Sequence, residues 1–84
     1  MKYQVKFTNQ AKRFLKKLDR KERSRILDKF EELREDPFRY LEHYEGEGYK
    51  FRIGAIRSII DAYQDKKILS VRIIDKRGRI YKKK

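Results

Sequence analysis

The stretch that decides the fold runs from Tyr49 to Arg57 and reads Tyr-Lys-Phe-Arg-Ile-Gly-Ala-Ile-Arg. Apolar and basic side chains alternate on both sides of Gly54-Ala55, which is the pattern of two half-buried strands. Glycine at the first position of a two-residue turn favours a tight β-hairpin. We therefore expect strands at Tyr49–Ile53 and Ile56–Tyr63, joined at this turn.

The register of this hairpin separates an apolar face from a basic one, because side chains directly opposite each other share a face. The turn pairs Ile53 with Ile56, Arg52 with Arg57, Phe51 with Ser58, and Lys50 with Ile59. The predicted apolar face collects Tyr49, Phe51, Ile53, Ile56, Ile60 and Ala62. The other face collects Lys50, Arg52, Arg57 and Ile59. Two opposed arginines cost about 0.2–1 kcal/mol, but a slip by one residue would bury Lys50 and Arg52, so the register is well specified.

A third strand, Ile68–Ile74, follows a turn around Asp65-Lys66 that places Tyr63 opposite Ile68. It adds Leu69, Val71 and Ile73 to the apolar face, and Ser70, Arg72 and Ile74 to the basic face.

The first half of the chain predicts one strand and two helices. Residues Tyr3–Phe7 alternate like a strand, and Thr8 or Asn9 can cap a helix whose apolar stripe is Ala11, Phe14, Leu15 and Leu18. Asp19, with Glu22 three residues later, begins a second helix with the stripe Ile26, Leu27, Phe30 and Leu33, which Pro37 ends. We expect an antiparallel helix hairpin, followed by a loop over residues 38–48.

Together these elements predict one α+β domain over residues 1–84: an antiparallel four-stranded sheet in the order β-α-α-β-β-β. The first strand would pack beside the three-stranded meander, and the helix hairpin would cover the apolar face. The chain has no cysteine, no signal-peptide pattern and no apolar run of membrane length, so we expect a cytoplasmic protein without disulfides or a membrane partner.

The formal charge of +12 on 84 residues favours a polyanionic partner. The last 36 residues contain twelve Lys or Arg and only three acidic residues. Such an excess also occurs where charge serves solubility or complements an acidic protein. The acidic residues Asp61, Asp65 and Asp75 lack the spacing of a magnesium site, so no metal and no other cofactor is expected.

The order of elements, the motif Tyr-Lys-Phe-Arg-Ile-Gly-x-x-Arg at 49–57 and the closing Lys-Arg-x-x-x-Tyr at 76–81 resemble the RelE/ParE superfamily of bacterial and archaeal toxins, within it the RelE branch. The resemblance covers essentially the whole chain. It implies a ribosome-dependent endoribonuclease that cleaves mRNA in the ribosomal A site and inhibits translation. It also implies a cognate RelB-like antitoxin, which should be acidic with amphipathic helices.

Carried over position by position, the resemblance implies a catalytic set of Lys50, Arg52, Arg57, Arg77 and Tyr81. We further expect Lys76, Arg79 and Arg72 to bind RNA. Two departures leave the proton-transfer roles open. Arg52 stands where some members have lysine, and a guanidinium does not deprotonate. Lys76 stands where many relatives have histidine, and the one histidine, His43, lies in the predicted loop.

These residue types suit RNA cleavage by attack of the 2′-hydroxyl on the adjacent phosphate. Arg57 and Arg77 can neutralise the phosphorane oxygens with forked donors. Lys50 could act as the base if neighbouring cations depress its pKa, and Tyr81 could stack on a base. The resemblance implies Arg77 as the proton donor.

Simpler interpretations remain for each of these residues. Lys50, Arg52 and Arg57 could form a solvated outer face, and Arg57 could pair with Asp61 or Asp75. Tyr81 could be a packing aromatic. Two other functions also fit the sequence: a ParE-type toxin that inhibits DNA gyrase, and a non-catalytic RNA- or ribosome-binding module.

Overall fold

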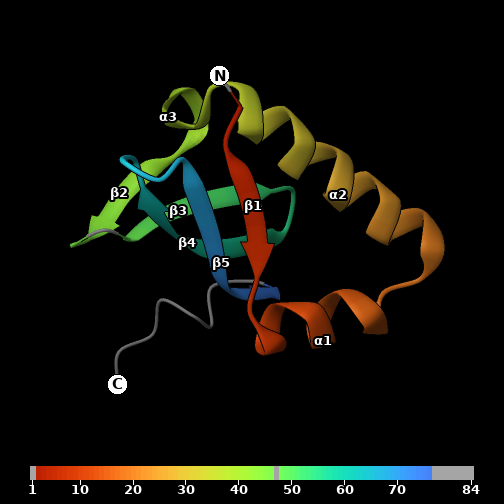
Figure 1. The fold of residues 1–84 in the computed structure, drawn as a ribbon. Coiled ribbons are helices and arrows are strands. Elements are labelled where there is room, and N and C mark those ends of the chain that lie inside the picture. The colour runs from red at the N-terminus through yellow and green to blue at the C-terminus, as the bar shows by residue number, and fades with distance from the viewer. Residues whose placement is uncertain (1, 47, 77–84) are drawn as a thin grey trace.

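Five strands form one mixed sheet in the order β1-β5-β4-β3-β2 in the computed structural model, which describes residues 2–46 and 48–76. In chain order the elements are β1 (Gln4–Phe7), α1 (Asn9–Lys17), α2 (Arg20–Glu35), α3 (Pro37–Tyr40), β2 (Glu42–Glu45), β3 (Gly48–Ile53), β4 (Ile56–Tyr63) and β5 (Ile68–Lys76). Figure 1 shows β1 and β2 at the two edges of the sheet.

The α+β class is as predicted, but the expected four-stranded antiparallel sheet is wrong in two respects. β1 does pack beside the meander, yet it pairs with β5 in parallel, with Gln4 opposite Ile68 and Phe7 opposite Val71. A parallel pair needs a long crossover connection, and the helices and the meander supply it.

The fifth strand, β2, lies within the predicted loop and places His43 on a strand. Its four residues are all exposed, so it has no alternation of buried and exposed side chains for a sequence pattern to reveal. β2 pairs with β3 through a bulge between His43 and Glu45. The same segment also contains the short helix α3, which begins at Pro37.

The predicted register of the central hairpin is confirmed. Arg52 lies opposite Arg57, and the Gly54-Ala55 turn uses a glycine with φ of +60°, in the left-handed region that glycine adopts readily. The second turn also pairs Tyr63 with Ile68, as expected.

The prediction for the end of the third strand of the meander is wrong, because a bulge lies opposite Ile59 and Ile60. The bulge puts one extra residue into β5 and exchanges the faces of the residues beyond it. Ile74 therefore joins the core and is fully buried, whereas Ile73 lies opposite Ile59 on the other face.

Both helices begin at the residues that the sequence indicates. The Thr8 hydroxyl accepts a hydrogen bond from the Ala11 amide at 3.3 Å, and the Asp19 carboxylate accepts one from the Glu22 amide at 2.8 Å. α2 ends at Glu35, two residues before Pro37.

The predicted helix hairpin is wrong. Only Leu18 and Asp19 join the two helices, and both have extended backbone angles that do not reverse the chain. α1 lies across the ends of β1 and β5, and α2 runs alongside β1 (Figure 1). The Arg23 guanidinium fixes the corner by donating to the carbonyls of Leu15 and Leu18, each at 3.2 Å.

Each helix buries its own apolar stripe on the same face of the sheet. Phe30 of α2 lies at the centre, with its ring centroid 5.3 Å from that of Phe7 and 5.4 Å from that of Phe51. The fully buried residues around it include Ile26, Leu33, Ile60, Leu69, Val71 and Ile74. This core fixes which side chains remain on the opposite, open face.

Candidate functional site

The open face of the sheet carries the four predicted site residues that lie on the strands of the meander. Lys50 and Arg52 belong to β3, Arg57 to β4 and Arg72 to β5. Arg52, Arg57 and Asp75 lie side by side in one row across three strands. The sheet therefore does bring these cations together, as the hairpin register predicts.

The next row of this face, Lys50, Ile59 and Ile73, has an apolar centre. Ile59 is only 2% exposed even though it lies on the face away from the helices. The cations are thus arranged around a buried isoleucine, beside which Ile73 is half-buried.

Arg52 is the most available cation of the row. Its side chain is exposed and makes no ion pair within residues 2–46 and 48–76. It lines a hollow of about 230 Å³ between β3, α2 and α3. Tyr40, which is 45% exposed, lines the same hollow. The sequence pattern does not indicate Tyr40 as a site residue, because α3 is too short to show a helical period.

Lys50 is half-buried and faces an acidic neighbour that the sequence pattern does not predict. β2 places Glu42 directly opposite it, and the Lys50 ammonium lies 3.7 Å from the Glu42 carboxylate. A phosphate that binds Lys50 would therefore compete with Glu42.

Arg72 is held by Asp61 through two hydrogen bonds. Its Nε donates to Oδ2 at 3.1 Å, and its Nη2 donates to Oδ1 at 2.8 Å. Hydrogen bonding to Asp61 is the main cause that raises the pKa of Arg72 above its ordinary value. A Cβ atom added at Gly48 would lie 3.0 Å from Nη2, so glycine there leaves room for the guanidinium. In this arrangement Arg72 braces β4 against β5.

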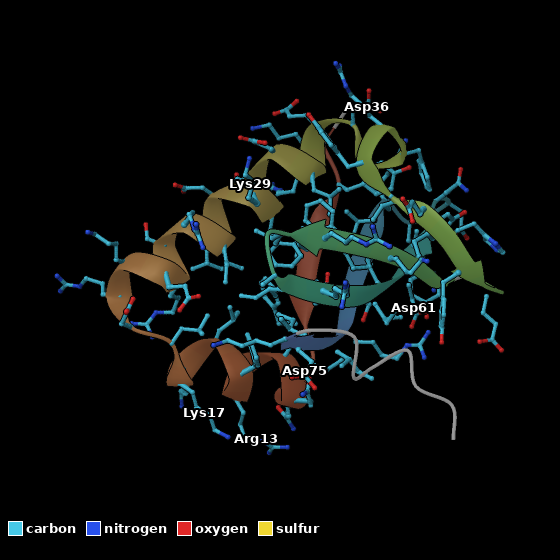
Figure 2. The ribbon with its side chains drawn as sticks, turned by 180° about the vertical axis from the view of Figure 1, so that it is seen from behind. Arg13, Lys17, Lys29, Asp36, Asp61 and Asp75 are labelled. Atoms are coloured by element: carbon cyan, nitrogen blue, oxygen red, sulfur yellow. The ribbon has the colours of Figure 1, made fainter. Side chains whose placement is uncertain are left out.

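Asp61 and Asp75 occupy separate parts of the molecule, with Asp75 beside α1 (Figure 2). Of the two acids named as alternative partners of Arg57, Asp61 binds Arg72, and Asp75 is directly opposite Arg57. Asp75 also accepts a hydrogen bond from the Lys76 amide at 2.7 Å.

Three predicted site residues, Arg77, Arg79 and Tyr81, lie outside the described residues. Lys76 is the last described residue; it is exposed and lies opposite Ile56, one position from Arg57. β5 thus ends beside the row of Arg52 and Arg57.

Within residues 2–46 and 48–76, no group of three or more His, Asp or Glu side chains is placed to hold a metal ion. In the same part of the chain, no helix has the length and apolar character needed to cross a membrane.

Comparison with known proteins gives a match in structure but not in sequence. No protein-family profile matches the chain, and no curated protein is similar to it. The toxin-antitoxin complex RelBE2 from Mycobacterium tuberculosis contains a chain of the same fold, with a TM-score of 0.81 and 22% identity over 92% of this chain and 100% of that one. The archaeal RelE-RelB complex from Pyrococcus horikoshii OT3 gives a TM-score of 0.77 and 24% identity, covering 94% of this chain and 99% of that one.

A third similar structure is the intact RelBE toxin-antitoxin complex of E. coli, with a TM-score of 0.74 and 20% identity over 88% of this chain and 95% of that one. These similarities extend over nearly the full length of both partners in each comparison. The chain therefore has the fold of the RelE toxins of bacteria and archaea.

Proposed function

We propose that this chain is the toxin of a type II toxin-antitoxin system, a RelE-type endoribonuclease that cleaves mRNA in the ribosomal A site without a metal ion. The full-length similarity to RelE toxin chains carries the proposal. The row of cations on the open face supports it, because a cleaved phosphodiester needs donors for its negative oxygens.

In the proposed reaction the 2′-oxygen forms a bond to the adjacent phosphorus, and the bond from phosphorus to the 5′-oxygen breaks. A base takes the 2′-hydroxyl proton, and an acid returns a proton to the leaving 5′-oxygen. Arg57 and Arg77 would hold the phosphorane oxygens with forked donors. Lys50 is the proposed base and Arg77 the proposed acid, with Tyr81 stacking on a base.

Arg52 would hold a flanking phosphate rather than act as the base, because its guanidinium stays protonated and cannot accept a proton. Its exposure fits a ligand that arrives from solvent. Tyr40, on the far side of the same hollow, offers a ring on which a neighbouring base can stack.

Lys50 and Arg77 are weak proton-transfer groups, so the reaction needs help from the ribosome. The ribosome would hold the 2′-hydroxyl close to the phosphorus and in line for attack. Engagement of Lys50 also requires that the RNA displace Glu42 from its ammonium group. We therefore expect the isolated protein to cleave naked RNA far more slowly than mRNA on a ribosome.

A RelB-like antitoxin is the second proposed partner, since three similar chains were solved as RelE–RelB complexes. A groove of about 410 Å³ separates β1 from α2 and is lined by Val5, Phe7, Leu27 and Phe30 among others. Leu27 is 37% exposed there. The apolar face of an amphipathic antitoxin helix would cover this groove.

The test compares mRNA on programmed ribosomes with the same RNA free in solution, each incubated with the purified chain and mapped by primer extension. Cleavage within the A-site codon on ribosomes, with little on free RNA, is expected. Equal rates on both substrates would refute ribosome dependence. Inhibition of gyrase supercoiling without RNA cleavage would establish the ParE-type alternative, and ribosome binding without any product would establish the non-catalytic one.

A further inference from the structure

Of the helices and strands in the described residues, α1 carries the largest net positive charge, larger than that of any strand of the open face. Two cations of the open face have acidic partners: Lys50 lies near Glu42, and Arg72 is bound to Asp61. The described cations of α2 that form ion pairs do so with acids close in sequence, Lys29 with Glu32 and Arg34 with Glu31.

The cations of α1 have no acidic residue within the helix to balance their charge. Between Thr8 and Leu18 the chain contains four cations, Lys12, Arg13, Lys16 and Lys17, and no acidic residue. All four are exposed, and none forms an ion pair within residues 2–46 and 48–76.

These cations form two rows on the outer side of the helix. Lys12 and Lys16 are four residues apart, as are Arg13 and Lys17, so each pair is stacked one turn above the other. Ala11 and Leu15 define the opposite, buried side. Figure 2 shows Arg13 and Lys17 pointing away from the sheet. Lys16 and Lys17 lie in the last turn, where positive charge favours the helix C-terminus. Lys12 and Arg13 have no such role, and like charges four residues apart destabilise a helix.

The position of α1 is fixed rather than loosely tethered. Beyond the end of β1, the Gln10 side chain continues the ladder on β5: its Oε1 accepts from the Ile74 amide at 3.2 Å, and its Nε2 donates to the Ile74 carbonyl at 3.5 Å. The Thr8 hydroxyl donates to the Arg72 carbonyl at 2.7 Å. The cationic rows are therefore held at the end of β5, next to the proposed cleavage face.

We propose that the outer face of α1 docks on the phosphate backbone of structured RNA, while the open face of the sheet receives the mRNA. The exposed arc that contains both cationic rows has no apolar side chain between Asn9 and Lys17. A protein partner would need apolar contacts at the centre of its interface, whereas a phosphate backbone requires only cations and polar groups. The choice of RNA among polyanions rests on the proposed function, in which ribosomal RNA surrounds the toxin.

The test measures binding of the full chain to a blunt RNA duplex of roughly 16 base pairs, about the length that shape-reading RNA-binding domains span, with every 2′-hydroxyl methylated. The variant is Arg13→Gln/Lys17→Gln, since glutamine keeps the helix propensity. The charge-matched control is Lys2→Gln/Lys66→Gln, which removes two cations at the other end of β1, where the Lys67 carbonyl accepts from the Gln4 amide. Lys2 lies 3.2 Å from Glu35, but both side chains are exposed, so the loss of this ion pair has little effect on stability. Circular dichroism verifies the helix content of both variants.

We expect the α1 variant to bind the duplex more weakly and to lower the slope of log K against log salt by about 1.4–1.8, which is two phosphate contacts at 0.7–0.9 each. The control should keep the wild-type slope. Equal weakening in both variants would attribute binding to net charge and overturn the proposal, as would a wild-type slope in the α1 variant. Loss of binding to an acidic amphipathic peptide, with duplex binding intact, would assign the surface to a protein partner and overturn it too. Duplex binding is measured without cleavage, so a chain that binds through α1 but cleaves nothing would refute the proposed function alone.

Discussion

Replacement of Asp61 by asparagine releases Arg72 and should change both stability and RNA binding in predictable directions. The Asp61 carboxylate accepts two hydrogen bonds from the Arg72 guanidinium, at 2.8 and 3.1 Å. Asparagine has nearly the same shape but keeps one acceptor oxygen and loses the charge. The guanidinium then becomes available to a phosphate, and a repulsive charge leaves the open face.

The stability loss follows from the exposure of the pair. The Arg72 side chain is 47% exposed and that of Asp61 is 19% exposed, so water screens the interaction but does not abolish it. Exposed pairs contribute 0.2–1 kcal/mol, and a bidentate geometry belongs near the upper end, about 1 kcal/mol. For a domain of this size that amounts to a decrease in Tm of roughly 4–8 °C. The decrease should shrink at 1 M salt, where the Debye length is about 3 Å.

The assay combines thermal unfolding with anisotropy titrations of a single-stranded, 2′-O-methylated RNA at several salt concentrations. We expect Asp61→Asn to bind more tightly than the wild type, with a slope of log K against log salt that is steeper by about 0.7. The control is Asp65→Asn, which removes the same charge in the β4–β5 turn, where Asp65 is exposed and makes no ion pair within the described residues. Equal gains in affinity for the two variants, or an unchanged Tm for Asp61→Asn at low salt, would refute the reasoning.

Four further predictions test other parts of the structure. Arg52→Ala should weaken binding to the same RNA without lowering Tm, because the side chain is exposed and unpaired within the described residues; a fall in Tm with unchanged RNA affinity would contradict it. Ile60→Ala should cost about 2–5 kcal/mol in urea unfolding because Ile60 is fully buried, and a cost below 1 kcal/mol would be inconsistent with this packing. Gln10→Ala should speed hydrogen exchange at the Ile74 amide, because the Gln10 side-chain oxygen accepts a hydrogen bond from this amide; unchanged protection would exclude this hydrogen bond as the source of the protection. Leu27→Glu should abolish antitoxin binding in calorimetry while the circular dichroism spectrum is retained, and full affinity would place the antitoxin elsewhere.

The elements that the sequence predicted correctly are those with strong local signals. Thr8 and Asp19 cap the helices because their side-chain oxygens accept hydrogen bonds from first-turn amides that have no partner within the helix. The Arg52–Arg57 register follows from a two-residue turn that leaves the pairing no freedom.

The elements that the sequence did not predict depend on contacts between distant segments. β2 exists only because it pairs with β3, and its exposed residues carry no period. β1 is parallel to β5 because of the path that the helices and the meander take between them. The bulge in β5 exchanges the faces of Ile73 and Ile74, and no glycine in the sequence indicates its position.

The candidate site likewise combines features that follow from the local sequence with features that depend on distant segments. The positions of Lys50, Arg52 and Arg57 on one face follow from alternation, but their acidic neighbours do not. Glu42 reaches Lys50 only through the unpredicted strand β2. Asp61 and Arg72 are eleven residues apart in the sequence and occupy diagonal positions on adjacent strands, since Asp61 lies directly opposite Ser70.

Primer extension on translating ribosomes tests the central claim most directly, with the wild-type chain compared with Arg57→Ala and Arg77→Ala. Lys66→Ala, in the exposed β4–β5 turn, serves as the charge-matched control. We predict A-site cleavage by the wild type and the control, and at least a hundredfold slower cleavage by either arginine variant, about the loss seen when one transition-state donor is removed. Undiminished cleavage by both arginine variants, or none by the wild type, would contradict the account.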